Sequence, residues 1–224
     1  MLADDFRLNE FSPDVRVDTA KASLKEELLS EHAHAQNMYS VIQRHHGYKE
    51  KLGHAYGDRC AYCGVPIGCI GYQSFQIDYI VCKNGNADDR ADVPTGIDSI
   101  ENLAFACVNC NGKKHDFTLT ELSLPLLSPD MDLGTTFVRN DDFSIEISHE
   151  YAGCKPVRAF YDRMHYGSEL RRIDYLIASL FDLDQYVNSN DELGELASKI
   201  SDLLRLALGS LIPRRNKSSI ALIA

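Results

Sequence analysis

Two short cysteine pairs decide how this 224-residue chain folds: Cys60-Ala-Tyr-Cys63, and Cys107-Val-Asn-Cys110 followed directly by Asn111. Two pairs with Cys-x-x-Cys spacing supply the four thiolates that close a tetrahedron around one Zn²⁺. We expect Cys60, Cys63, Cys107 and Cys110 to bind such an ion. Its role would be structural, because four thiolates leave it no open position. The ion would draw two distant segments, and the polar side chains beside them, into one small region.

The composition predicts a globular protein of the cytoplasm. The chain is 44% hydrophobic, and no stretch approaches the roughly 20 apolar residues of a membrane span. Residues 1–7 are acidic and charged, unlike the basic-then-apolar start of a signal peptide. In such a setting, cysteines favour metal binding over disulfides. We expect Cys69, Cys82 and Cys154 to be small buried side chains outside the zinc site.

The charge balance excludes a protein that binds nucleic acid over its whole surface. The net charge is −10 and the pI about 5.2, whereas such binding needs an excess of Lys and Arg. Residues 36–120 are nevertheless nearly balanced, with one more acidic than basic side chain. Arg59 precedes the first cysteine pair, and Lys113 and Lys114 follow the second. Both a basic patch beside the zinc and an ordinary solvated helix face fit this pattern.

Apolar periodicity predicts an α+β fold. Residues 19–46 carry one apolar stripe at helical spacing, which favours a single N-terminal helix. Residues 75–81 and 103–107 alternate as strands do, and a loop rich in Asn, Asp and Gly separates them over 83–99. A helix is expected from Asn111 onward. The order is therefore strand, loop, strand, helix.

The last hundred residues are predicted to be mostly helical. A short strand is expected from Phe143, and helices are expected from Pro156, after Ser168 and after Asp191, the last ending at Gly209. We predict three parts: an N-terminal helical segment (1–55), a zinc-stapled domain (56–120) and a C-terminal mostly helical region (121–224).

The motifs around the cysteines resemble the HNH endonuclease family, the ββα-metal nucleases. The matching stretches are Ile77-Asp-Tyr-Ile-Val81, Glu101-Asn-Leu103 and Cys107-Val-Asn-Cys-Asn-Gly-Lys-Lys114, in register with the first cysteine pair. The resemblance covers about residues 56–120. It implies a zinc-stapled ββα-metal core and a divalent-metal-dependent endonuclease that hydrolyses DNA phosphodiester bonds.

The resemblance also assigns roles to individual residues. Asp78 and Asn111 would be ligands of a catalytic Mg²⁺ or Mn²⁺, and Asn102 would be the amide that orients the general base. Apart from the resemblance, we expect the charges of Lys113 and Lys114 to contact flanking phosphates of the nucleic acid. Tyr79 stands where the family has its general-base histidine, and Cys82 where the family usually has proline.

Tyr79 is the main departure from the family pattern. A phenol has a pKa of about 10, against about 6.5 for an imidazole, so it is a poor base at neutral pH. Three interpretations remain: an activated phenol, a site that activates water through another group, and a site that has lost catalysis. Asp78 and Tyr79 would also point to opposite faces of an ideal strand.

His115 is the candidate for that other group. On a helix beginning at Asn111, His115 would lie four residues on and share a face with Asn111, so both would reach one metal ion. A histidine exposed to solvent beside Lys113 and Lys114 is the alternative.

Two other functions compete with the endonuclease. The first is a catalytically degenerate HNH-like module that binds nucleic acid or a partner protein. The second is a nuclease of an antiviral defence system, kept silent until an ATPase or sensor subunit docks on the C-terminal region. The sequence leaves DNA against RNA open.

Overall fold

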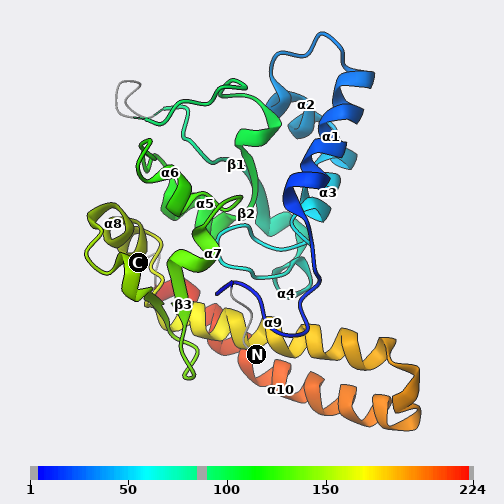
Figure 1. Cartoon of the computed structure of the whole chain (residues 1–224). Helices are drawn as coiled ribbons and strands as arrows, with labels where there is room; N and C mark the ends of the chain where they lie inside the picture. The colour runs from blue at the N-terminus through cyan, green and yellow to red at the C-terminus, as the bar shows by residue number, and fades with distance from the viewer. Residues whose placement is uncertain (1–4, 85–89, 222–224) are drawn as a thin grey trace.

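The centre of the molecule is a two-stranded antiparallel sheet with a helix at its end (Figure 1). The structure is a computed structural model and describes residues 5–84 and 90–221. Strand β1 is Phe75–Tyr79, strand β2 is Leu103–Cys107, and helix α5, Val108–Lys114, follows β2 directly. The predicted order of strand, strand and helix is confirmed, as is the α+β fold class.

The two strands form because each has apolar residues to bury. Every residue of β2 is buried, as a short, continuously apolar run requires, and the rings of Phe75 and Phe105 stack with centroids 4.7 Å apart. Strand β1 ends at Tyr79, two residues earlier than predicted. The reason is local: the Val81 N–H donates to the side chain of Asn102 at 2.8 Å instead of to a neighbouring strand.

The N-terminal region contains three helices, so the prediction of one helix over 19–46 is wrong. They are α1 (Val17–Glu31), α2 (Met38–Arg44) and α3 (His46–Ala55). The apolar pattern did not reveal the helix N-cap at Asn37. The Asn37 side chain accepts a hydrogen bond from the Ser40 N–H at 2.8 Å, and a new helix, α2, begins there. All three helices lie on the same side of the sheet (Figure 1).

The first cysteine pair is covered by the chain's own N-terminal segment. Gly64 follows Cys63 with φ +75°, and a Cβ there would lie 2.1 Å from the Arg7 carbonyl oxygen, so only glycine fits. The Arg7 guanidinium donates to the carbonyl oxygens of Ala61 at 2.5 Å and Pro129 at 3.0 Å. These contacts hold residues 5–9 against the turn that carries Cys60 and Cys63.

The rest of the chain wraps around this centre in short elements. The predicted strand at Phe143 is present as β4 (Ile145–Ile147), and the predicted helix at Pro156 is present as α8 (Lys155–Arg163), with Pro156 in its first turn. The loop predicted over 83–99 is irregular where described, and 85–89 lie outside the described residues. The short elements are α4 (Ile67–Ile70), η1 (Tyr72–Ser74), η2 (Ile100–Asn102), α6 (Leu124–Leu127), α7 (Leu133–Thr136), β3 (Phe137–Arg139), β4 (Ile145–Ile147), η3 (His149–Tyr151) and α8 (Lys155–Arg163).

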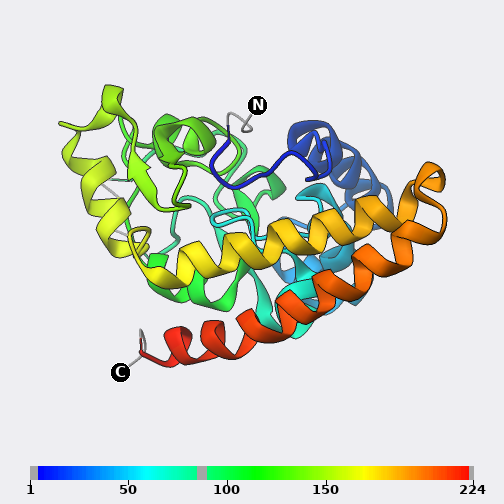
Figure 2. The same ribbon diagram turned by 90° about the horizontal axis from the view of Figure 1, so that it is seen from below.

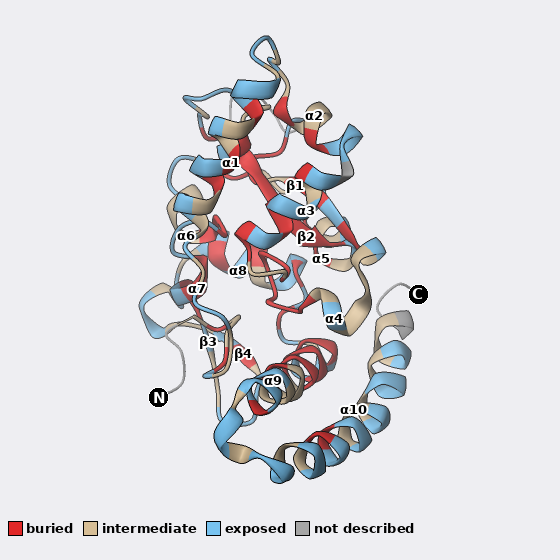
Figure 3. Cartoon of the chain, turned by 90° about the vertical axis from the view of Figure 1, so that its right-hand side faces the viewer, coloured by how far each residue is buried: buried red, intermediate tan, exposed pale blue. Residues whose placement is uncertain are grey.

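Two long helices close the fold. Helix α9 is Glu169–Ser189, the turn η4 is Asp191–Leu193, and α10, Glu195–Ala221, runs back antiparallel along α9 (Figure 2). Helix α9 buries one face, while α10 is mostly exposed (Figure 3). The predicted stop at Gly209 is wrong, because α10 continues through it. A glycine costs a helix only about 1 kcal/mol, which packing against α9 offsets.

One apolar core contains residues from each of the three predicted parts of the chain. It includes Phe6 and Leu28 from the N-terminal part, Phe105 from the sheet, and Phe160 and Tyr166 from the C-terminal part. The division at residues 55 and 120 stays a prediction, although no boundary interrupts this core. Within the described residues, no helix is long and apolar enough to cross a membrane.

Candidate functional site

The four predicted zinc ligands meet at one point. The sulfur atoms of Cys60, Cys63, Cys107 and Cys110 lie within 4.8 Å of one another, and all four residues are buried. The Cys107 N–H donates to the Cys60 sulfur at 3.3 Å, and the Cys110 N–H donates to the Cys107 sulfur at 3.4 Å. The turn after α3 carries one pair, and the junction of β2 with α5 carries the other.

This donor set suits a structural zinc ion. Four sulfur ligands at these spacings match a tetrahedral Zn²⁺ site. Burial raises the pKa of the Cys110 thiol well above its ordinary value, so a bound cation would be needed to keep the cluster ionised. Among the described residues, these cysteines are the one group of three or more Cys, His, Asp or Glu that is placed to hold a metal.

Asp78 lies on β1 and is engaged from two sides. Its side chain is buried, Tyr62 donates to its Oδ2 at 2.6 Å, and the ammonium of Lys114 lies 3.1 Å from the same oxygen. Burial raises the pKa of Asp78, and the attraction of Lys114 and the hydrogen bond from Tyr62 only partly offset that rise. Tyr62 belongs to the first cysteine pair, so it links the zinc end of the core to Asp78.

Lys114 does not lie where a phosphate contact was expected. Its side chain is fully buried, and its ammonium also donates to the Tyr79 carbonyl oxygen at 2.6 Å. Helix α5 points Lys114 inward because it lies four residues after the buried Cys110 and therefore shares its face. Lys114 neutralises Asp78 inside the core.

Tyr79 is on the opposite face of β1 from Asp78. Its hydroxyl donates to Asp98 at 2.6 Å, and its ring stacks on Tyr39 with centroids 4.9 Å apart. Burial and the Asp98 carboxylate both raise the pKa of Tyr79. A phenol that acts as a base needs a lower pKa, so this environment works against that role.

Asn102 bonds to the backbone. Its amide accepts from the Val81 N–H at 2.8 Å and donates to the carbonyl oxygens of Val81 at 3.1 Å and Ile97 at 2.8 Å. These bonds hold the chain as it leaves β1, so Asn102 braces the strand end. The hydroxyl of Tyr79, which Asn102 was expected to orient, is held by Asp98.

Asn111 and His115 keep the predicted spacing of four residues, and the His115 N–H donates to the Asn111 carbonyl oxygen at 2.8 Å, but His115 is the C-terminal cap of α5. Helix α5 begins at Val108 and ends at Lys114, so His115 lies just beyond it, with φ +45°. The Asn111 amide donates to Gln76 at 2.7 Å. The His115 side chain is 71% exposed, and its Nδ1 lies 3.0 Å from Asp116 Oδ1.

A cleft between β1 and α5 gathers most of the predicted catalytic residues. It has a volume of about 380 Å³, and Asp78, Tyr79, Asn111 and His115 all line it. Asn102 lies instead on a separate cavity of about 630 Å³ beside α1. Tyr62 and Asp98 are partners of this site that were not predicted from the sequence. The position of Tyr62 inside a cysteine pair was an available signal, while Asp98 lies in an irregular loop and carried none.

A second hollow adjoins this cleft. It measures about 710 Å³, shares Val108 and Gly112 with the cleft, and separates α5 from the end of α10. Lys113 and Arg215 contribute its charged side chains, and the lining residues described include no carboxylate. In a chain with a net charge of −10, an acid-free hollow beside the candidate site is a local exception.

The comparison with protein families identifies the domain that holds both sites. Residues 60–117 match the family model of the HNH endonucleases. This segment is an HNH domain. The comparisons with curated proteins and with solved structures found no match. The HNH domain indicates a function in nucleic-acid binding or cleavage, and it agrees with the four-cysteine cluster, which is suited to zinc.

Proposed function

We propose that this chain is a divalent-metal-dependent endonuclease that hydrolyses DNA phosphodiester bonds in the cleft between β1 and α5. The observation that carries the proposal is the cleft itself, because Asp78 from β1 meets Asn111 and His115 from the second cysteine motif there. These residues come from the two halves of the HNH domain, which the zinc ion would hold together.

Asp78 and Asn111 are the residues that would hold the catalytic metal. A carboxylate and an amide supply the oxygen ligands that Mg²⁺ and Mn²⁺ prefer, so the donor chemistry fits. When bound, such an ion stabilises negative charge on the phosphate and the leaving oxygen. Lys114 competes with it, because its ammonium already compensates the charge of Asp78. We expect weak metal affinity for this reason.

His115 is the proton acceptor that we propose in place of Tyr79. Its Nδ1 faces Asp116, which is held in turn by Arg163 at 2.9 Å. A carboxylate at Nδ1 leaves Nε2 of the neutral ring free to take a proton from water.

Nucleic acid would enter along the second hollow. Lys113 lines it and is the remaining candidate for a phosphate contact, since Lys114 is buried. Arg215 lines it as well, although its guanidinium also bonds Asp174 at 2.8 Å. Few cationic groups and a net charge of −10 predict modest affinity for nucleic acid, with a shallow salt dependence because few phosphates are neutralised.

The alternative function is a degenerate module that binds nucleic acid or a partner without cutting. The observations that favour it are the raised pKa of Tyr79 and the internal neutralisation of Asp78 by Lys114. A protein partner, such as an ATPase or sensor subunit of a defence system, would dock on the C-terminal helices. Leu196, Leu203 and Leu206 on α10 are exposed and support such docking. Copurification from the native host tests the partner.

Nicking of supercoiled plasmid with Mg²⁺ or Mn²⁺ tests the enzyme. We expect wild type to nick, Asp78→Asn to abolish nicking, and His115→Gln to slow it by about 10²–10⁴-fold. His54 provides a matched control, because it is also an exposed histidine, with Nδ1 at 2.9 Å from a carboxylate, Asp58. His54→Gln and Tyr79→Phe should nick like wild type.

The outcomes separate the two functions. Equal nicking by wild type and Asp78→Asn contradicts the endonuclease proposal and points to a contaminating nuclease. Absence of nicking with every metal, together with duplex binding measured by fluorescence anisotropy, supports the degenerate module. Nicking lost in Tyr79→Phe but kept in His115→Gln would assign the base to Tyr79 instead.

A further inference from the structure

Helix α9 places a buried guanidinium beside the cysteine cluster. The side chain of Arg171 is 2% exposed, and its Nη2 donates to Asn109 Oδ1 at 3.2 Å and to the Met164 carbonyl oxygen at 3.0 Å. Asn109 lies inside the second cysteine pair, between Cys107 and Cys110. Arg171 itself lies outside residues 60–117, which match the HNH family.

Arg171 is short of partners for its charge. Its Nε and Nη1 are buried, and neither has a hydrogen-bond acceptor among the described residues. The nearest carboxylate in an ion pair with it, Asp174, is 3.9 Å away and also pairs with Arg215 at 2.8 Å. A buried cation with unsatisfied donors is costly unless an anion lies nearby.

The cysteine cluster supplies that anion. One Zn²⁺ and four thiolates together carry a net charge of about −2, in a site with no exposed ligand. Burial alone would lower the pKa of Arg171, but the charges of Cys110, Cys63 and Cys107 raise it well above its ordinary value. The cluster and the guanidinium therefore stabilise each other.

We propose that Arg171 is the counter-cation of the four-cysteine zinc site, so that α9 contributes an outer-shell residue to the metal centre. The guanidinium offsets the cluster's negative charge and, through Asn109, holds the second cysteine pair in place. The other pair is held from the same region, because the Tyr166 hydroxyl donates to the Tyr62 carbonyl oxygen at 2.9 Å. This inference rests on zinc binding and not on DNA cleavage.

Zinc release from the full chain tests the proposal. Zinc content is measured first, and transfer to 4-(2-pyridylazo)resorcinol is then followed in native buffer. Arg171→Met should release zinc about 10-fold faster than wild type, because loss of an outer-shell partner weakens metal affinity by about 10–100-fold. Arg171→Lys keeps the charge and should fall between them. Release from Arg171→Met at the wild-type rate overturns the proposal.

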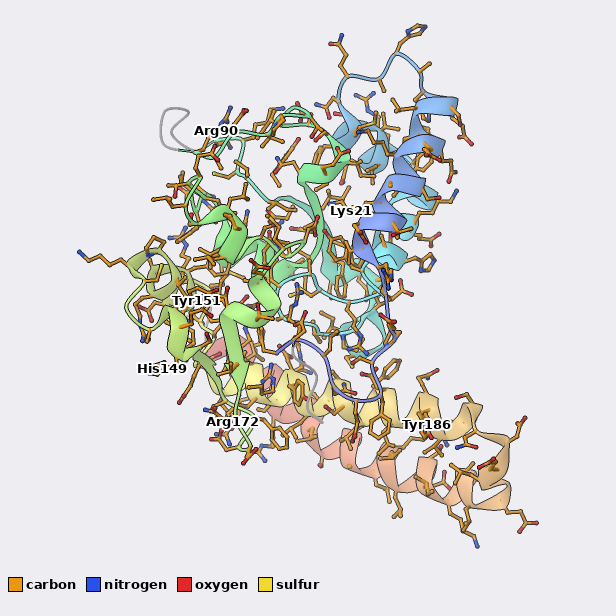
Figure 4. All side chains as sticks on the ribbon, in the orientation of Figure 1. Lys21, Arg90, His149, Tyr151, Arg172 and Tyr186 are labelled. Atoms are coloured by element: carbon orange, nitrogen blue, oxygen red, sulfur yellow. The ribbon has the colours of Figure 1, made fainter. Side chains whose placement is uncertain are left out.

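Arg172 provides the matched control. It is the next residue of α9, but its side chain is 45% exposed and pairs with Asp142 at the β3–β4 hairpin (Figure 4). Arg172→Met should release zinc like wild type. If it releases zinc as fast as Arg171→Met, the effect belongs to α9 in general and the proposal fails.

Cobalt substitution separates charge from mere packing. A nearby cation stabilises the thiolate electrons, so its removal should move the thiolate-to-cobalt charge-transfer band to longer wavelength in Arg171→Met but not in Arg172→Met. If Arg171→Met does not fold, Asn109→Ala supplies the test, since it cuts the hydrogen bond to the cysteine pair. Faster zinc release from Asn109→Ala supports the proposal, and an unchanged rate overturns it. A wild-type chain without zinc overturns the zinc site as well.

Discussion

The zinc end and the cleft end of the HNH domain are built on the same two strands and one helix, yet they differ in what their polar groups do. At the zinc end, four buried sulfur atoms converge on one point, where a metal ion would balance their charge as thiolates. At the cleft end, each polar group already has a protein partner: Asp78 has Lys114 and Tyr79 has Asp98. The first site needs a metal to be complete, whereas the second must give up an existing contact to bind one.

The largest expected effect comes from the zinc end. Cys110→Ser should reduce the zinc content from one ion per chain to nearly none and abolish the cooperative thermal transition. Zinc binding by structural sites supplies about 10–16 kcal/mol, which is comparable to the whole stability of a typical domain, about 5–15 kcal/mol. Zinc analysis and circular dichroism measure both effects.

Cys154 is the control for this change. It is half-buried and lies outside the cluster, so Cys154→Ser should keep the zinc and shift the melting temperature little. A folded, zinc-free Cys110→Ser chain would show that the core is stable without the ion, and the contrast between the two ends would disappear.

Breaking the buried ion pair tests the cleft end. Lys114→Met leaves Asp78 charged and unpaired, and should lower the free energy of unfolding by about 3–5 kcal/mol in urea. The double variant Lys114→Met/Asp78→Asn should recover much of that loss. Lys113→Met is the neighbouring control and should cost less.

The Lys114→Met variant also tests whether Asp78 binds a divalent cation. If Lys114 and a divalent cation compete for Asp78, then Mg²⁺ should raise the melting temperature of Lys114→Met more than that of wild type. Equal shifts in the two proteins would mean that Asp78 does not bind the added ion.

A smaller effect is expected from the link between the two ends. Tyr62→Phe removes the hydroxyl that donates to Asp78 at 2.6 Å and should cost about 1–3 kcal/mol, because a buried acceptor loses one partner. Zinc content should stay at the wild-type value. Zinc loss in Tyr62→Phe would show that the two ends are not independent.

The smallest effect concerns pH. Although burial alone would raise it, hydrogen bonds from Lys83 and Tyr79 lower the pKa of Asp98 below its ordinary value of 3.8. A lowered folded-state pKa contributes stability above pH 3.8, and that contribution is lost as the pH falls through the folded value. Urea unfolding between about pH 5 and pH 2.5 should therefore show a shallower acid loss in Asp98→Asn than in wild type.

Tyr79→Phe tests how much of the lowered pKa of Asp98 comes from the hydrogen bond of the Tyr79 hydroxyl. It removes one of the two donors to Asp98 and should give an acid loss between those of wild type and Asp98→Asn. A loss identical in all three proteins would mean that Asp98 titrates alike in the folded and unfolded chains.

The sequence predicted the zinc end better than the cleft end, for a physical reason. Cysteine spacing restricts geometry directly, since a Cys-x-x-Cys turn can present two sulfurs to one point by itself. The partner of Asp78 depended on the bounds of α5. The start of α5 at Val108 places Cys110 inside the helix, so Lys114, four residues later, faces inward, and the end of α5 at Lys114 leaves His115 beyond the helix. Asp98 is brought to Tyr79 by an irregular loop, whose path no periodicity encodes.

Local contacts that the apolar pattern does not encode also explain the two wrong helix predictions, over residues 19–46 and at Gly209. The apolar stripe over residues 19–46 is real, but a single capping amide at Asn37 divides it. A local hydrogen bond outweighed a long pattern there. At Gly209 the reverse happened, since packing along α9 carried α10 past a residue that often ends helices.

The contact between Gly64 and Arg7 limits how far this protein can be truncated. The backbone of residue 7 lies where a side chain at position 64 would be, and its guanidinium spans Ala61 and Pro129. A fragment trimmed to the family-matched segment would lack this lid and the arginine on α9. Such a fragment should lose its zinc to chelators faster than the full chain does. The smallest stable HNH unit of this chain is therefore larger than the family-matched segment, residues 60–117.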